Sequence, residues 1–299
     1  MNDVGSVDRY GRSARFAGAL MLAPMQLQLI VVLAIPSLYV LWLSFTQSSY
    51  GADYSFVGWA NYAAILADPI FWRSLINTLI VVNIVVYVEV GLSVGVALLF
   101  QGVRSGRAVL MAAILAPYAI SEVVAVLAWR FLLEPDIGML TALLSHFGYV
   151  LNWATNPNEA LILVALIGVW LHLPFSFLLI YAALIAIPGE LHEAAHIDGA
   201  RPWQGFRYVT LPLLMPAILI AIIFRYIFGF RIFTEVWLLT QGGPARSTEV
   251  MAVYLYKNAF RYNEFGMAAA TGWLMVLGAL LMASFYVYHI YRSGFRNEA

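Results

Sequence analysis

Long apolar runs alternate with short polar segments along almost the whole chain. A helix needs about 20 apolar residues to cross the hydrocarbon core of a bilayer, and six stretches are that long. We predict membrane helices at residues 17–45, 74–100, 108–133, 159–187, 211–239 and 265–290. The pattern therefore predicts an all-α membrane protein, with one six-helix domain over residues 17–290 and tails at 1–16 and 291–299.

Composition supports a membrane location and excludes several kinds of chemistry. Charged residues make up only 11% of the 299 residues, whereas a soluble domain has about 25%. The chain has no cysteine, which excludes disulfides and thiolate catalysis. A formal net charge of zero gives no general attraction to nucleic acid.

Basic residues predict how the chain is oriented, because they concentrate on the cytoplasmic side of membrane proteins. One set of flanking segments contains Arg9, Arg12, Arg15, Arg104, Arg107, Arg201, Arg207, Arg292 and Arg296. The other set is longer and contains only Arg73, Arg246, Lys257 and Arg261. We predict that the first set and both termini are cytoplasmic, and that the loops at 46–73, 134–158 and 240–264 face outward.

The single lysine argues against nucleotide hydrolysis by this chain. A P-loop places its lysine directly after a glycine-rich turn, where it neutralises phosphate groups. Lys257 lies in Tyr-Leu-Tyr-Lys-Asn, with no glycine before it. If ATP drives a process here, another polypeptide must hydrolyse it.

Residues 188–210 are predicted to form a helix–turn–helix in the cytoplasm. Pro188 suits the first turn of a short helix. Asp198-Gly199 is a turn signal, because glycine accepts the left-handed conformation that commonly ends a helix. Pro202 can then start a second short helix.

One interpretation of this segment is a zinc site. His192-Glu193-x-x-His196 matches H-E-x-x-H, in which two histidines on one helical face bind zinc and the glutamate is the general base. The longer form of the motif needs a third histidine at position 202, where the chain has Pro202. This makes a zinc metalloprotease the weaker hypothesis, and we predict no metal site.

A second interpretation uses more positions. The same segment contains Glu193-Ala194-Ala195 and Asp198-Gly199-Ala200, followed by Phe206 and Leu211-Pro212. Trp129-Arg130-Phe131-Leu132 and Leu239-Thr240-Gln241-Gly242-Gly243-Pro244 extend the pattern. Together these residues resemble the carbohydrate branch of the permease subunits of binding-protein-dependent ABC importers. The similarity spans about residues 20–290, and Gln241 stands where that branch usually has glycine.

The resemblance implies a type I ABC importer permease, with no catalytic residues and no bound cofactor, in a bacterial cytoplasmic (inner) membrane. It implies four kinds of partner: a second related permease, two ATP-binding subunits that use ATP and Mg²⁺, an extracytoplasmic sugar-binding protein and membrane lipid. The residues implied in contact with the ATP-binding subunits are Glu193, Ala194, Ala195, Asp198, Gly199, Ala200 and Phe206. The outer docking loop is implied at Gly242, Gly243 and Pro244.

Polar residues inside the apolar runs are candidates for a substrate path, because ionisable groups at membrane depth are costly and usually functional. Glu122 and Arg225 lie at similar predicted depth, so they can pair with each other or Arg225 can face the substrate. Asn77 and Asn83 can bind either neighbours or sugar. Arg231 and Glu235 are four residues apart and are predicted to form an intrahelical pair.

Two questions stay open at the level of sequence. Buried pairs that only fix helix packing explain these charges as well as substrate contact does, and Glu89 has no evident partner. The alternative transport class is an ion-coupled secondary carrier, which often shows inverted repeats. No repeat is visible here, and a carrier has no need of a Glu-Ala-Ala loop.

Overall fold

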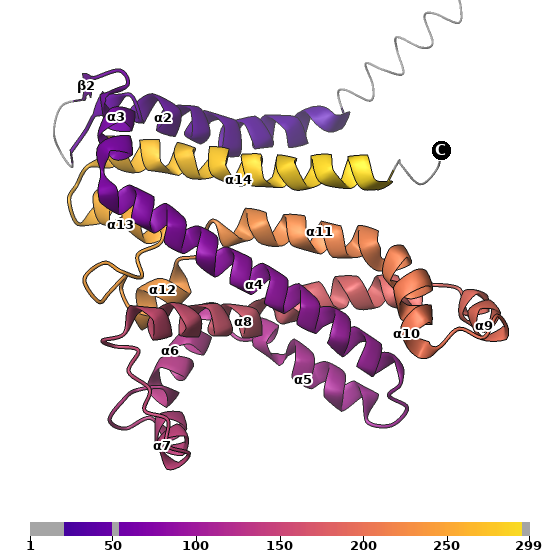
Figure 1. The fold of residues 1–299 in the computed structure, drawn as a ribbon. Coiled ribbons are helices and arrows are strands. Elements are labelled where there is room, and N and C mark those ends of the chain that lie inside the picture. The colour runs from indigo at the N-terminus through magenta and orange to yellow at the C-terminus, as the bar shows by residue number, and fades with distance from the viewer. Residues whose placement is uncertain (1–20, 50–53, 295–299) are drawn as a thin grey trace, which may run out of the picture.

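Helices of membrane length dominate the computed structural model, which describes residues 21–49 and 54–294 (Figure 1). Within those residues, five helices are long and apolar enough to cross a membrane: Met21–Leu43, Pro69–Gln101, Pro157–Ile185, Pro202–Gly229 and Phe265–Phe285. The bent pair Arg107–Ala119 and Glu122–Leu132 makes a sixth. The predicted all-α, six-helix fold class is confirmed. The predicted tail at 1–16 lies outside the described residues.

Two long helices, α4 (Pro69–Gln101) and α8 (Pro157–Ile185), pack along each other at the centre. Each begins with a proline preceded by a capping side chain: Asp68 accepts from the Ile70 amide at 2.8 Å, and Asn156 from the Asn158 amide at 3.1 Å. Such caps satisfy amide groups that have no partner at a helix start. Small and branched side chains between the two helices, such as Val85 and Ala165, form the main apolar core.

Prolines explain the two π-helical turns. The segment η1 (Ile30–Ala34) precedes α2 (Ile35–Leu43), which has Pro36 in its first turn, and η2 (Phe206–Thr210) precedes α11 (Leu211–Gly229), which starts with Leu211-Pro212. Proline has no amide hydrogen, and its ring pushes away the carbonyl four residues earlier. A wider turn relieves that contact while the helix continues.

The predicted single helix at 108–133 is wrong, because the chain turns by 98° between α5 (Arg107–Ala119) and α6 (Glu122–Leu132). Ile120 and Ser121 have extended backbone, with ψ of 142° and 131°. Pro117 near the end of α5 removes one helical hydrogen bond just before this corner. The apolar run therefore forms two helices joined at an angle.

The predicted helix at 211–239 is also interrupted. Helix α11 ends at Gly229, and the short helix α12 (Thr234–Leu239) follows after four residues of different backbone conformation. A Cβ atom at Gly229 would lie 2.8 Å from Cγ1 of Val82. Glycine therefore allows α11 to approach α4 closely at the point where the helix stops.

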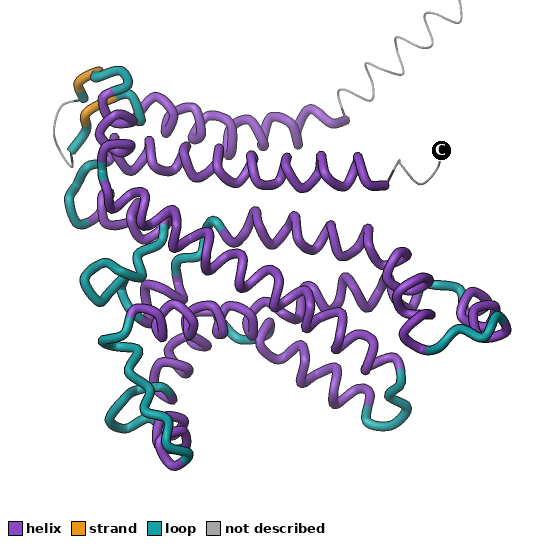
Figure 2. The backbone as a smooth tube through the Cα atoms, in the orientation of Figure 1, coloured by secondary structure: helices purple, strands orange, loops and turns teal. Residues whose placement is uncertain are grey.

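The connections between helices collect at two opposite ends of the molecule (Figures 1 and 2). One end carries the α4–α5 connection, the helices α9 (Gly189–Ile197) and α10 (Pro202–Gly205), and the last turns of α14 (Phe265–Gly294). The other end carries α3 (Ala60–Ala67), α7 (Met139–His146), α13 (Met251–Phe260) and the short antiparallel pair β1 (Thr46–Gln47) and β2 (Ser55–Phe56).

This grouping places the predicted cytoplasmic connections together and the predicted outer loops together. Which end faces the cytoplasm stays a prediction. The first helix, Met21–Leu43, lies along α14, and none of its residues is buried. Its apolar side chains are therefore open to lipid or to another subunit.

Candidate functional site

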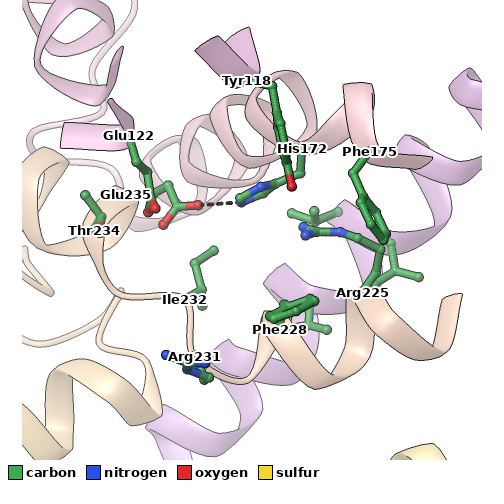
Figure 3. A pocket seen from close by; sticks show the side chains of 14 residues that line it. Tyr118, Glu122, His172, Phe175, Arg225, Phe228, Arg231, Ile232, Thr234 and Glu235 are labelled. Carbon is green, nitrogen blue, oxygen red and sulfur yellow. Dashed lines mark hydrogen bonds and ion pairs between the residues drawn. The ribbon is translucent and has the colours of Figure 1, made fainter. Parts of the chain in front are cut away.

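A cavity of about 450 Å³ lies where the two helix interruptions meet (Figure 3). The α5–α6 corner provides Tyr118 and Glu122, and the segment joining α11 to α12 provides the opposite wall. Helix α8 adds His172 and Phe175, and α4 adds valines. The interruptions thus direct polar side chains and backbone into a space within the membrane helices, where irregular backbone is tolerated because it lines a cavity.

Two carboxyl groups form one side of this cavity. Glu122 is the first residue of α6 and Glu235 the second of α12, positions at which the helix dipole favours an acid. Glu122 lies beside Glu235 and Thr234 in the cavity lining, and Oε1 of Glu235 lies 3.3 Å from Nε2 of His172. The two carboxyl groups make this side of the cavity acidic.

A buried ion pair stands on another side. Nε of Arg225 donates to Oε2 of Glu89 at 2.8 Å, and the Ser176 hydroxyl donates to the other carboxylate oxygen. The Glu89 side chain is 0% exposed and that of Arg225 is 6% exposed. Arg225 therefore pairs with Glu89 and not with Glu122, while one side of Arg225 lines the cavity. This pair also supplies the partner of Glu89 that the sequence did not reveal.

The predicted intrahelical pair of Arg231 and Glu235 is wrong. Arg231 lies in the interruption after α11, so the two residues do not share a helix, and Glu235 contacts His172 and Glu122 instead. Arg231 is exposed at the rim of the cavity. Spacing of four residues brings side chains together only when the intervening backbone is helical.

The two asparagines of α4 are engaged in packing. Nδ2 of Asn77 donates to the carbonyls of Ser247 and Glu249, at 2.8 and 2.9 Å. Oδ1 of Asn83 accepts from the Tyr226 hydroxyl at 2.6 Å. They connect α4 to the loop at 240–250 and to α11, and neither of them lines the cavity.

The segment 188–210 folds into two short helices at one end of the molecule. Two backbone hydrogen bonds terminate helix α9. The Gly199 amide donates to the His196 carbonyl at 3.0 Å, and the Ala200 amide donates to the Ala195 carbonyl at 2.9 Å. Gly199 has φ of +77°, as this left-handed termination requires. Helix α10 starts at Pro202 and continues through η2 and Phe206 into α11.

The surface of this helical hairpin is open. No residue of α9 is buried, and Glu193, Ala194, Asp198 and Gly199 are all exposed. Ile197 is 86% exposed and Trp203 is 65% exposed. Large apolar side chains held outward on a rigid projection are typical of a protein interface.

The histidines of the H-E-x-x-H match are not held together by a third ligand in the part of the chain described here. Nε2 of His192 lies 3.1 Å from Oγ1 of Thr210, and His196 is exposed. A search of the described residues finds no group of three or more His, Cys, Asp or Glu side chains placed to hold a metal ion.

The loop at 240–250, which is predicted to face outward, is braced by buried charges. Glu249 is 0% exposed and receives Nζ of Lys257 at 2.6 Å and NH2 of Arg246 at 2.6 Å. This contact with Glu249 raises the pKa of Arg246. The Thr248 amide donates to the Gly242 carbonyl at 3.2 Å and its hydroxyl to the Gly243 carbonyl at 2.7 Å. The loop therefore presents Gly242, Gly243 and Pro244 from a fixed frame.

Sequence reasoning missed part of the cavity lining. Tyr118, His172, Phe175 and Phe228 were not identified as site residues, because aromatic side chains are frequent throughout membrane helices. His172 carried the clearest signal, since a histidine deep in an apolar run is costly unless it has a polar partner.

These features define a class: a membrane transport subunit with interrupted helices around an internal polar cavity and a helical projection at one end. The chain belongs to the family described as "Binding-protein-dependent transport system inner membrane component", which matches residues 15–293. It is therefore a multi-pass inner-membrane permease subunit and not an enzyme. This membership does not favour a secondary carrier or a zinc protease.

Relatives of similar length support this assignment. The chain is 31% identical over 283 residues to the trehalose/maltose transport system permease protein MalF of Thermococcus litoralis, covering 94% of this chain and 95% of that protein. It is 34% identical over 266 residues to the inner membrane ABC transporter permease protein YcjO of Escherichia coli, covering 87% and 89%.

Solved structures share the fold. A chain of a bacterial ABC transporter involved in the import of the acidic polysaccharide alginate matches with a TM-score of 0.83 at 22% identity, covering 95% of this chain and 99% of that one. The same kind of transporter in complex with an alginate pentasaccharide-bound periplasmic protein matches with a TM-score of 0.82 at 21% identity, covering 94% and 96%.

Proposed function

We propose that this chain forms half of the pore of an ATP-driven sugar importer, and that the cavity between the two helix interruptions is where sugar passes. The observation that carries this proposal is the cavity lining, which combines aromatic rings with planar hydrogen-bonding groups. The names of the relatives, which include a trehalose/maltose permease and a trehalose permease of Mycobacterium tuberculosis, support sugar as the substrate class.

The cavity chemistry suits a polyhydroxylated ring. Sugar hydroxyls donate and accept hydrogen bonds, and the Glu122–Glu235 pair, His172 and Arg225 offer both kinds of partner. The C–H faces of a sugar pack on flat apolar surfaces, which Phe175 and Phe228 provide in the same cavity. A few convergent polar groups in a mostly apolar concave site are typical of small-molecule binding.

The surfaces at the two opposite ends of the molecule suit different partner proteins. The braced outer loop with Gly242, Gly243 and Pro244 would receive an extracytoplasmic binding protein, and the periplasmic protein in the alginate transporter complex supports such a partner. The α9–α10 hairpin, with Glu193, Ala194, Ala195, Asp198, Gly199, Ala200 and Phe206, would contact ATP-binding subunits that use ATP and Mg²⁺. A second permease would complete the pore.

A continuous helix connects the α9–α10 hairpin to the cavity and can transmit movement between them. Residues Pro202–Gly229 form one helical stretch, which is about 40 Å long at about 1.5 Å per residue. It starts in the hairpin and ends at the interruption beside the cavity. Movement of the hairpin when ATP-binding subunits close would therefore tilt the wall that carries Arg225 and Phe228, which is the change that alternating access needs.

Replacing one aromatic wall of the cavity tests the sugar route. We expect Phe228→Ala to reduce ATP-driven maltose or trehalose uptake about tenfold, because an aromatic packing surface worth about 1–1.5 kcal/mol is lost. Uptake would be measured in proteoliposomes that contain the assembled importer and its binding protein.

Ile220→Ala is the control. Ile220 lies two turns earlier on α11, is 45% exposed against 48% for Phe228, and does not line the cavity. Uptake should stay near that of the unmodified importer. Equal losses in the two variants would argue against the cavity as the sugar route.

A further inference from the structure

The charged groups around the cavity are distributed unevenly, and this distribution indicates which sugars it admits. We propose that the cavity selects against negatively charged sugars, such as uronates and sugar phosphates, and that Glu122 and Glu235 set this selectivity. The inference rests on the proposed function, because it assigns a substrate class to the same cavity.

Arg225 is already paired with a carboxylate, so it offers no unpaired positive charge to an anion. Arg225 is paired with the fully buried Glu89, and the two charges cancel within the wall. Arg130 lies elsewhere and donates NH1 to the Leu238 carbonyl at 2.7 Å. The remaining arginine that lines the cavity, Arg231, carries one positive charge, and the two carboxyl groups of Glu122 and Glu235 in the same lining outnumber it.

The acidic wall adds repulsion. An anion that enters would lie against Glu122 and Glu235, the two carboxyl groups that line the same side of the cavity. His172 faces Glu235 at 3.3 Å, so any positive charge on its imidazole is directed to that carboxyl group. An anion would therefore lose its water without gaining an uncompensated positive charge, and this arrangement disfavours its binding.

Neutral polyols meet no such penalty. A hydroxyl group can donate to the carboxyl pair and accept from Arg225 or the imidazole, so each polar group of the wall gains a partner. The alginate importer with the same fold imports an acidic polysaccharide. Charge selectivity in this fold would accordingly be set by the residues of the cavity, and not by the fold.

The absence of cysteine from this chain allows a direct test. A single Tyr118→Cys substitution places a thiol in the cavity beside His172 (Figure 3). The assembled importer in detergent is treated with two methanethiosulfonate reagents of similar size, one carrying trimethylammonium and the other sulfonate. An importer without the substitution gives the background from other subunits.

We expect the cationic reagent to react about tenfold faster than the anionic one at this thiol, relative to their ratio at Phe147→Cys. Phe147 is 77% exposed near the end of α7, far from the cavity lining. Adding Glu122→Gln or Glu235→Gln should lower this preference about threefold. Glu134→Gln, which alters a carboxylate just beyond α6 and outside the cavity, should leave it unchanged.

Equal rates, or a faster anionic reagent, would overturn the inference. If Tyr118→Cys does not assemble, Phe228→Cys reports on the same cavity. Saturating maltose should slow both reagents if sugar enters here. A cationic preference without protection by sugar would support the charge selectivity while counting against the proposed sugar route, so the two proposals fail separately.

Discussion

Gly199→Val is expected to reduce ATP-driven uptake at least about tenfold while leaving the chain in the membrane. Gly199 has φ of +77°, a conformation that costs a β-branched residue about 1–3 kcal/mol. A Cβ atom there has nothing within 4 Å, so the effect comes from the backbone and not from a clash. The turn between α9 and α10 would open, and the surface with Glu193 and Asp198 would lose its shape.

The measurement compares uptake and ATP hydrolysis in the same proteoliposomes. We expect uptake to fall at least about tenfold, since a strain of about 1.4 kcal/mol already corresponds to that factor, while the amount of membrane-inserted chain stays unchanged. Gly189→Val is the matched control. Gly189 is the first residue of α9 and does not have the left-handed conformation. A Cβ atom at Gly189 would also have no other atom within 4 Å. Similar losses in both variants would mean that this turn does not transmit the motion.

Arg225→Met is expected to cause the largest loss of stability, about 3–5 kcal/mol, because it leaves the carboxylate of Glu89 buried without its partner. The free energy of unfolding would be measured by titrating the solubilised protein with a denaturing detergent. Arg231→Met makes the same substitution at an exposed position and should change stability by less than about 0.5 kcal/mol.

A double variant separates a lost partner from lost packing. Glu89→Gln with Arg225→Met removes both charges and keeps an acceptor for the Ser176 hydroxyl. We expect it to recover most of the stability, since a buried pair replaced by uncharged groups is often close to neutral. A double variant as unstable as Arg225→Met alone would show that the arginine matters through packing and not through its charge.

Apolar run length predicted the membrane helices well, because spanning a bilayer imposes a minimum length on each. The hairpin at 188–210 was predictable for a different reason: Pro188, Asp198-Gly199 and Pro202 each restrict the backbone locally. These local restrictions were enough to predict where the first short helix begins, where the chain turns and where the second short helix begins.

The helix interruptions could not be predicted in the same way. Pro117 lies just before the α5–α6 corner, yet Pro174 and Pro216 lie inside helices that continue. A proline weakens a helix at each of these positions, and neighbouring helices decide whether the chain then turns. The hydropathy profile does not reveal either interruption, because the helices before and after each interruption are similarly apolar.

The ion pair of Glu89 and Arg225 was beyond sequence reasoning, since it joins residues of α4 and α11 that only the packed bundle brings together. Similar depth suggested Glu122 as the partner of Arg225, but depth alone does not say which helices are neighbours. Once the interruptions are known, the meeting of Glu122 with Glu235 follows from two helix starts that face one cavity.

The most direct test of the account is to identify what each end of this chain touches. Because the chain lacks cysteine, single Ile197→Cys and Pro244→Cys variants can be labelled with a photoreactive maleimide in the assembled importer. Ile197 is 86% exposed on the α9–α10 hairpin, and Pro244 lies in the loop at 240–250, at the opposite end of the molecule. We predict that the first label cross-links an ATP-binding subunit and the second the extracytoplasmic binding protein. Exchange of these two partners, or no adduct from the hairpin label with an ATP-binding subunit, would contradict the account.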